Sequence, residues 1–186
     1  MSSWKYYLEA ISDRLAPNYD LSANETVAGQ MVDLVARFKM RSEKYFLLKK
    51  ITLYAYENHE TVLIQGRERI TPYLARQYCG FLQQAVLELV NPDDEHMYSL
   101  VTGVLVARRG IASEARSIIE RFSYSRNFKF LLQGWCEVRL LAVDLAANEV
   151  YSNKAGRAVC EAYRVPEKKG GKETVSKPQM VSQNRP

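Results

Sequence analysis

The stretch Ala36-Arg37-Phe38-Lys39-Met40-Arg41 decides the fold of this chain, because it alternates apolar residues with cations. A period of two residues is the pattern of a β-strand with one buried face and one face in water. We therefore expect this stretch to open a β-sheet whose wet face is basic. The segments on either side extend the sheet and supply the helices that cover it.

Two further strands are predicted after this stretch, over residues 45–56 and 61–65, with turns at 42–44 and 57–60. The first of them is rich in aromatic and β-branched residues, which favour strands. The polar tetrapeptide Glu57-Asn58-His59-Glu60 fits a hairpin connection. Three consecutive strands with short turns predict an antiparallel meander. Before it, we interpret residues 18–25 as a polar connection and 27–35 as a short helix or the approach to the strand.

Helices are predicted before and after the meander. Apolar residues at helical spacing predict a first helix over residues 4–15 and a long one after Thr71-Pro72, a cap followed by a proline suited to the first turn. Residues 113–122 predict another helix, and Asn153 begins a last one that ends near residue 163. Strands are predicted at residues 97–107, 128–132, 136–145 and 150–151.

These elements predict an α+β or mixed α/β fold. We expect a single domain over residues 1–165, with a sheet of about five to seven strands packed against two long helices and the N- and C-terminal helices. Residues 166–186 contain few large apolar groups, so we expect a disordered basic tail. The net charge of the chain is +5, and the tail carries five cations against two carboxylates, so the folded body is only weakly basic.

Cysteine usage and hydropathy predict a soluble cytoplasmic protein. Cys79, Cys136 and Cys160 are far apart in the sequence, which argues against a zinc site of closely spaced cysteines. Separated thiols in odd number are typical of a reduced compartment. The first residues lack the apolar core of a signal peptide. No apolar run approaches the roughly 20 residues that span a bilayer, so we expect no membrane contact.

Cations around the first strand form one candidate binding surface. Residues 37–50 carry six cations and one carboxylate, interleaved with Tyr45 and Phe46. Cations beside aromatic rings can follow a phosphate backbone and stack on bases. The same cations also suit an edge strand that must avoid aggregation. Together with two arginines that follow a later strand, the candidate binding residues are Arg37, Lys39, Arg41, Lys44, Lys49, Lys50, Arg108 and Arg109.

Acidic residues with an imidazole form the other candidate site. The 57–60 turn places two carboxylates and a histidine within four residues, and such oxygen ligands suit Mg²⁺ or Mn²⁺. The candidate catalytic residues are Glu57, His59, Glu60 and Asp144, and the candidate metal ligands are Glu57, Glu60, Glu95 and His96. Polar residues at a hairpin tip are also explained by solvation alone.

The order helix, three strands, helix, strand over about residues 4–107 is similar to the core of the PD-(D/E)XK nucleases. That family places an acidic residue near the end of its second strand and an acid, one spacer and a lysine on its third. The resemblance implies that Glu57 and Glu60 bind a metal for phosphodiester cleavage. Val62 stands where the family has its lysine, so the residue that assists the attacking water is missing.

The sequence favours a non-enzymatic function. It holds two histidines and neither of the phosphate-loop motifs G-x-x-x-x-G-K-[ST] and G-x-G-x-x-G. We predict a cytoplasmic interaction domain that needs no cofactor, and its twelve tyrosines suit contact surfaces. The partner stays open between a second copy of the chain and, more weakly, nucleic acid. The alternatives are a nucleic-acid-associated domain that uses the basic strand and a divergent divalent-metal phosphodiesterase.

Overall fold

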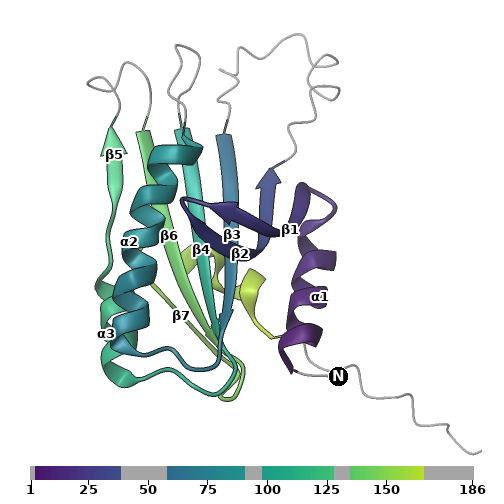
Figure 1. Ribbon diagram of the computed structural model, residues 1–186, viewed down its shortest axis with the longest axis vertical. Helices are drawn as coiled ribbons and strands as arrows, with labels where there is room; N and C mark the ends of the chain where they lie inside the picture. The colour runs from purple at the N-terminus through teal and green to yellow at the C-terminus, as the bar shows by residue number, and fades with distance from the viewer. Residues whose placement is uncertain (1–2, 39–57, 91–97, 128–134, 166–186) are drawn as a thin grey trace, which may run out of the picture.

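The computed structural model describes residues 3–38, 58–90, 98–127 and 135–165 (Figure 1). The elements follow the order α1 (Ser3–Leu15), β1 (Tyr19–Val27), β2 (Gln30–Phe38), β3 (Asn58–Arg67), α2 (Pro72–Leu89), β4 (Tyr98–Ala107), α3 (Ser113–Arg121), β5 (Ser125–Asn127), β6 (Trp135–Asp144), β7 (Glu149–Ser152) and the 3₁₀ helix η3 (Arg157–Tyr163). The predicted α+β fold is confirmed, because a mixed seven-stranded sheet carries helices on both faces.

The sheet has the strand order β1-β2-β3-β4-β6-β5, and β7 also pairs with β6. β1, β2 and β3 are antiparallel neighbours, whereas β3, β4 and β6 are parallel. Parallel neighbours need a crossover connection, and here α2 and α3 provide it. The three parallel strands therefore all begin at the upper end of the sheet in Figure 1, and their connections into α2 and α3 leave from the lower end.

The predicted meander exists, but different residues form it. Residues 18–25, expected to be a connection, form most of β1, and residues 27–35, expected to be a helix or an approach, form the β1–β2 turn and most of β2. β1 is an edge strand of the sheet and its sequence is mostly polar. Its sequence therefore lacks the alternation of apolar and polar residues that marks a half-buried strand. Ala28 and Gly29 both have positive φ, as a two-residue hairpin turn requires.

The prediction of a turn at residues 57–60 is wrong for residues 58–60, which the structure describes. Asn58 already begins β3. Its backbone pairs in register with Tyr98, so the parallel β3–β4 ladder starts there and leaves no hairpin. The strand predicted over 36–41 is the end of β2 as far as Phe38. The remainder of that strand, the 42–44 turn, the strands at 45–56 and 128–132 and the tail over 166–186 lie outside the described residues.

Two hydrophobic layers hold the helices on the sheet. α2 and α3 cover one face, where Tyr78, Phe81 and Leu82 pack into the larger cluster. α1 and η3 cover the other face, where Tyr7 and Ile11 are fully buried. Glycine permits the closest approach on the α2 side, because a Cβ on Gly103 would lie 2.5 Å from the Leu82 side chain.

The two terminal elements are also tied to each other. The Tyr7 hydroxyl donates to the Tyr163 carbonyl at 3.0 Å, and the Arg14 guanidinium donates to the Ala162 carbonyl. Burial raises the pKa of Tyr7, so this hydroxyl stays a donor at any physiological pH. In the part of the chain that the structure describes, no helix is long and apolar enough to cross a membrane.

Candidate interaction site

The predicted basic residues do not gather at one place among those that the structure describes. Arg37, near the end of β2, forms an ion pair with Glu25 of β1. Arg108 and Arg109 follow β4 at the opposite end of the sheet, and both lie within ion-pair distance of Glu68, at 4.0 and 2.5 Å. The five predicted lysine and arginine positions between residues 39 and 50 lie outside the described residues.

The carboxylate of Glu60, on β3, is engaged by side chains of three other strands, β1, β4 and β6. It accepts hydrogen bonds from the hydroxyls of Tyr19 and Thr102, each at 2.9 Å, and pairs with Arg139 at 3.4 Å. Burial, together with this carboxylate, raises the pKa of Tyr19, so the phenol remains a donor. Both carboxylate oxygens of Glu60 already accept hydrogen bonds. We therefore interpret Glu60 as a structural residue that links strands across the sheet.

The other candidate metal ligands, Glu57, Glu95 and His96, lie outside the described residues. The backbone of His59, a candidate catalytic residue, pairs with Ser99 in the β3–β4 ladder. Within the described ranges, no group of three or more His, Cys, Asp and Glu side chains could hold a metal ion. The metal role implied by the nuclease resemblance therefore finds no ligand set in this part of the chain.

Asp144 ends β6 and is only 6% exposed. One carboxylate oxygen accepts from the backbone N–H groups of Ala146 and Ala147, at 3.0 and 3.2 Å. The other accepts from the Ile111 N–H at 3.1 Å. Asp144 therefore closes the turn after β6 and ties the β4–α3 connection to it, which accounts for a buried carboxylate by structure alone.

A different site lies where β2 and β3 separate beneath α2. Their described ladder runs from Arg37↔Thr61 to Leu34↔Ile64. Beyond that point, hydrogen bonds from side chains replace the backbone ladder between the two strands. The Asp33 carboxylate accepts from the Gly66 N–H at 2.8 Å, and the Gln65 side chain donates to the Met31 carbonyl at 2.6 Å. These bonds satisfy backbone groups that the parting strands would leave unpaired. They also tie the two parting strands to each other.

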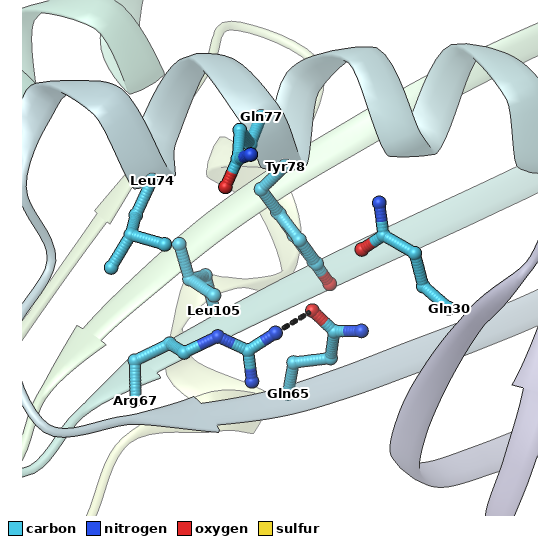
Figure 2. A pocket seen from close by; sticks show the side chains of 7 residues that line it. All are labelled: Gln30, Gln65, Arg67, Leu74, Gln77, Tyr78 and Leu105. Atoms are coloured by element: carbon cyan, nitrogen blue, oxygen red, sulfur yellow. Dashed lines mark hydrogen bonds between the residues drawn. The ribbon is translucent and has the colours of Figure 1, made fainter.

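A crevice of about 20 Å³ lies at this fork, between β3 and α2 (Figure 2). It is lined by Gln30, Gln65, Arg67, Leu74, Gln77, Tyr78 and Leu105. The Arg67 guanidinium donates to the Gln65 side chain at 2.9 Å and to the Gly66 carbonyl at 2.8 Å, which fixes its orientation. The space suits about one water-sized group and is far smaller than the roughly 300–1,000 Å³ of a small-molecule site.

Exposed apolar side chains occur on the two elements that border the crevice, the hairpin and α2. Met31, next to Gln30 in the hairpin, is 58% exposed, and Tyr73, whose hydroxyl accepts from Gln77 at 2.7 Å, is 66% exposed. Leu87, 49% exposed, lies on the same outward stripe of α2 as Tyr73, because fourteen residues make nearly four helical turns. We call Gln30, Met31, Tyr73, Gln77 and Leu87 the hairpin–helix surface.

The hairpin and the helix are held together at the far end of this surface. The Ala28 N–H donates to the Glu88 carboxylate at 2.9 Å, which fixes the hairpin tip against the last turn of α2. Between Tyr73 and Leu87 the outward stripe passes through Gly80. A Cβ at Gly80 would meet no atom of the described structure within 4 Å. The middle of the helix is therefore flat and open.

The chemistry of the crevice suits binding. Of its seven lining residues only Arg67 is charged, and none is a carboxylate, histidine, serine or cysteine. The Tyr78 hydroxyl donates to the Leu63 carbonyl at 2.8 Å, and burial raises the pKa of Tyr78. Burial also raises the pKa of the adjacent Cys79 thiol to about 11. The lining therefore offers hydrogen bonds but no ready nucleophile or general base at neutral pH.

Sequence reasoning missed this surface and its crevice because their residues come from the hairpin, β3 and α2. Gln30, Gln65 and Gln77 are too far apart in the sequence to form a local motif. One signal was available: Gln65 follows the apolar run Val62-Leu63-Ile64 and is 1% exposed. A polar residue that continues a buried strand marks a place where its amide must find partners inside the protein.

Comparisons with known proteins give one match. The model of the family described as "Domain of unknown function (DUF8052)" matches residues 4–165, which takes in nearly all of the described elements from α1 to η3. No curated protein matches the chain. No solved structure matches it either.

Proposed function

Since the chain belongs to the DUF8052 family, a domain of unknown function, we propose its role from its own geometry: it is a protein-binding module that uses the hairpin–helix surface. The observation that carries the proposal is the exposure of Met31 on the hairpin and of Tyr73 on α2, the two elements that border a polar crevice. Protein interfaces combine such apolar and aromatic anchors with a few placed polar groups. We place this function in the cytoplasm, because the three cysteines are free thiols.

Gly80 adds independent support. Glycine inside a helix costs about 1 kcal/mol relative to alanine, so it normally persists for a reason of packing. No atom of the described structure approaches the Cβ position of Gly80, so packing within these residues does not require it. A partner that lies close against the outward stripe of α2 would require it, because any side chain at this position would hold the two backbones apart.

The size of the crevice favours a protein as the partner. One water-sized space cannot enclose a metabolite, but it can take the tip of a single side chain. The exposed apolar residues then lie against the neighbouring parts of the same segment. A partner built in this way contacts the crevice and the outward stripe of α2 together.

The test is panning of a phage-displayed peptide library on the full-length protein. We expect peptides that bind the wild type and lose at least about tenfold in affinity on Met31→Ser, since the loss of one central apolar anchor has an effect of that size. Gly80→Gln should weaken binding as well, although glutamine is the better helix former and leaves the fold intact.

Phe38→Ser is the matched control. Phe38 is also a large exposed apolar residue, 46% exposed, but its aromatic contact is with Tyr19 on β1. Binding should be unchanged in this variant. An absence of enriched peptides, or peptides that bind Met31→Ser as well as the wild type, would overturn the proposal. A dimer of the full-length protein in sedimentation that Met31→Ser dissociates would replace the separate partner with a second copy.

A further inference from the structure

We infer that the partner inserts a carboxylate side chain, aspartate or glutamate, into the crevice of the hairpin–helix surface. This inference rests on the proposed function and specifies the chemistry of its ligand. The crevice carries one charge, the Arg67 guanidinium, and no carboxylate among its lining residues. A guest placed there meets a cation and the neutral amides of Gln30 and Gln77.

Arg67 is prepared for such a guest. Its two hydrogen bonds, to the Gln65 side chain and the Gly66 carbonyl, hold the guanidinium along the floor of the crevice (Figure 2). A guanidinium has five N–H donors, so two fixed bonds leave others to meet an incoming acceptor. A fixed guanidinium also loses less freedom on binding a carboxylate, since its geometry is already set.

The size of the crevice limits which chemical groups of a partner could reach Arg67. A crevice with room for about one water-sized group admits an oxygen of a planar carboxylate. A phosphate, with four oxygens around one phosphorus, needs more space. A lysine or arginine of a partner would face a like charge, which is unfavourable at a contact. The combination of one cation and one small space therefore points to an acidic side chain.

The apolar residues nearby set the context of that acid. Met31 follows Gln30 in the hairpin, Tyr73 is bonded to Gln77 on α2, and Leu87 follows farther along α2. The inference therefore describes an acidic residue flanked by apolar ones, in a segment that crosses the hairpin and the open stretch at Gly80. Apolar residues on both sides of the partner's acid would exclude water from its ion pair with Arg67, as the neutral contacts around a binding hot spot do.

A pair of charge variants at one exposed position tests the sign of the interaction. Gln30 lies at the exposed mouth of the crevice, so Gln30→Glu and Gln30→Lys change the charge there without disturbing the buried Gln65. With peptides selected on the wild type, Gln30→Glu should lower affinity by about tenfold, and Gln30→Lys should preserve or raise it. The difference should shrink in high salt, because salt screens an exposed charge. Asn127→Asp, at an exposed position of β5 on the opposite edge of the sheet from the hairpin, is the control and should change affinity little.

The peptides supply the second half of the experiment. The selected sequences should share an Asp or Glu at one aligned position, and its replacement by the matching amide should remove the difference between Gln30→Glu and Gln30→Lys. Peptides that depend on Met31 but lack a common acid, or that respond equally to both Gln30 variants, would overturn this inference and leave the binding surface standing. Failure to select any peptide would instead overturn the proposed function first.

Discussion

Asn153 acts as a substitute for a missing strand, and its removal gives a sharp test of the structure. β5 pairs with β6 at residues 135–137 and β7 pairs with it at 141–144, so between them neither strand supplies partners for the Val138 carbonyl and the Leu140 N–H. The Asn153 amide bridges this gap. It donates to the Val138 carbonyl at 3.0 Å and accepts from the Leu140 N–H at 3.1 Å, as a backbone amide would.

The cost of Asn153→Ala follows from the groups that it leaves behind. Asn153 is 1% exposed, so the Val138 carbonyl and Leu140 N–H would lose their partner where water does not easily replace it. An unsatisfied buried polar group costs about 1–3 kcal/mol, so the two together predict a loss of about 3 kcal/mol in the free energy of unfolding. The same side chain also accepts from the Gly156 N–H at 2.9 Å, so η3 should loosen at its start.

Urea denaturation of the full-length protein measures this loss, and thermal unfolding should show a fall of roughly 6–12 °C in Tm. Asn127→Ala is the matched control. Asn127 is an exposed asparagine of β5, and its removal should change stability by less than about 0.5 kcal/mol, as is usual at the surface. A loss below about 1 kcal/mol for Asn153→Ala, the low end for even one unsatisfied group, would refute the strand-substitute argument.

Two further predictions concern the glycines and the partly buried thiol of the α2 layer. Gly103→Ala should destabilise the protein by about 1–3 kcal/mol, because its new Cβ would crowd a side chain of α2 at 2.5 Å. Gly80→Ala should instead stabilise it by up to about 1 kcal/mol, since the space there is open and alanine favours the helix; urea denaturation decides both signs, and equal signs would contradict the assigned packing. Cys79 should react slowly with iodoacetamide at pH 8 and speed up about tenfold per pH unit toward its pKa of about 11, because only the thiolate attacks. Fast labelling at pH 8 in the folded protein, followed by mass spectrometry of this cysteine, would refute the burial assigned to it.

The centre of the fold was predictable, because its patterns are strong. Apolar runs that end at turns located β4, β6 and β7, and amphipathic spacing located α2 and α3, each within a few residues. Such patterns persist because these elements are buried on one or both faces. β1 was not predictable in this way. It is a polar edge strand, and residues such as Asp20 and Asn24 give it the composition of a loop.

The candidate site was less predictable than the fold, for a reason of distance in the sequence. Acidic residues that stand close together in the sequence, such as Glu57 and Glu60, attract a functional interpretation, yet Glu60 is occupied by Tyr19, Thr102 and Arg139. The crevice instead joins the hairpin to α2 across 47 positions, from Gln30 to Gln77. Only the way that β2 and β3 part beneath α2 brings these residues together.

The two glycines of the α2 layer show why the surface points outside the chain. Gly103 has an internal cause, since Leu82 occupies the place of its missing side chain. Gly80 should weaken α2 by about 1 kcal/mol relative to alanine, as a glycine inside a helix usually does. No described atom lies within 4 Å of the position that its Cβ would take. Gly80 stands on the same outward stripe as the exposed Tyr73 and Leu87. No described residue uses the room that the missing side chain of Gly80 leaves. A binding loss for Gly80→Gln, in a fold that is no less stable, would separate a role in binding from a structural role.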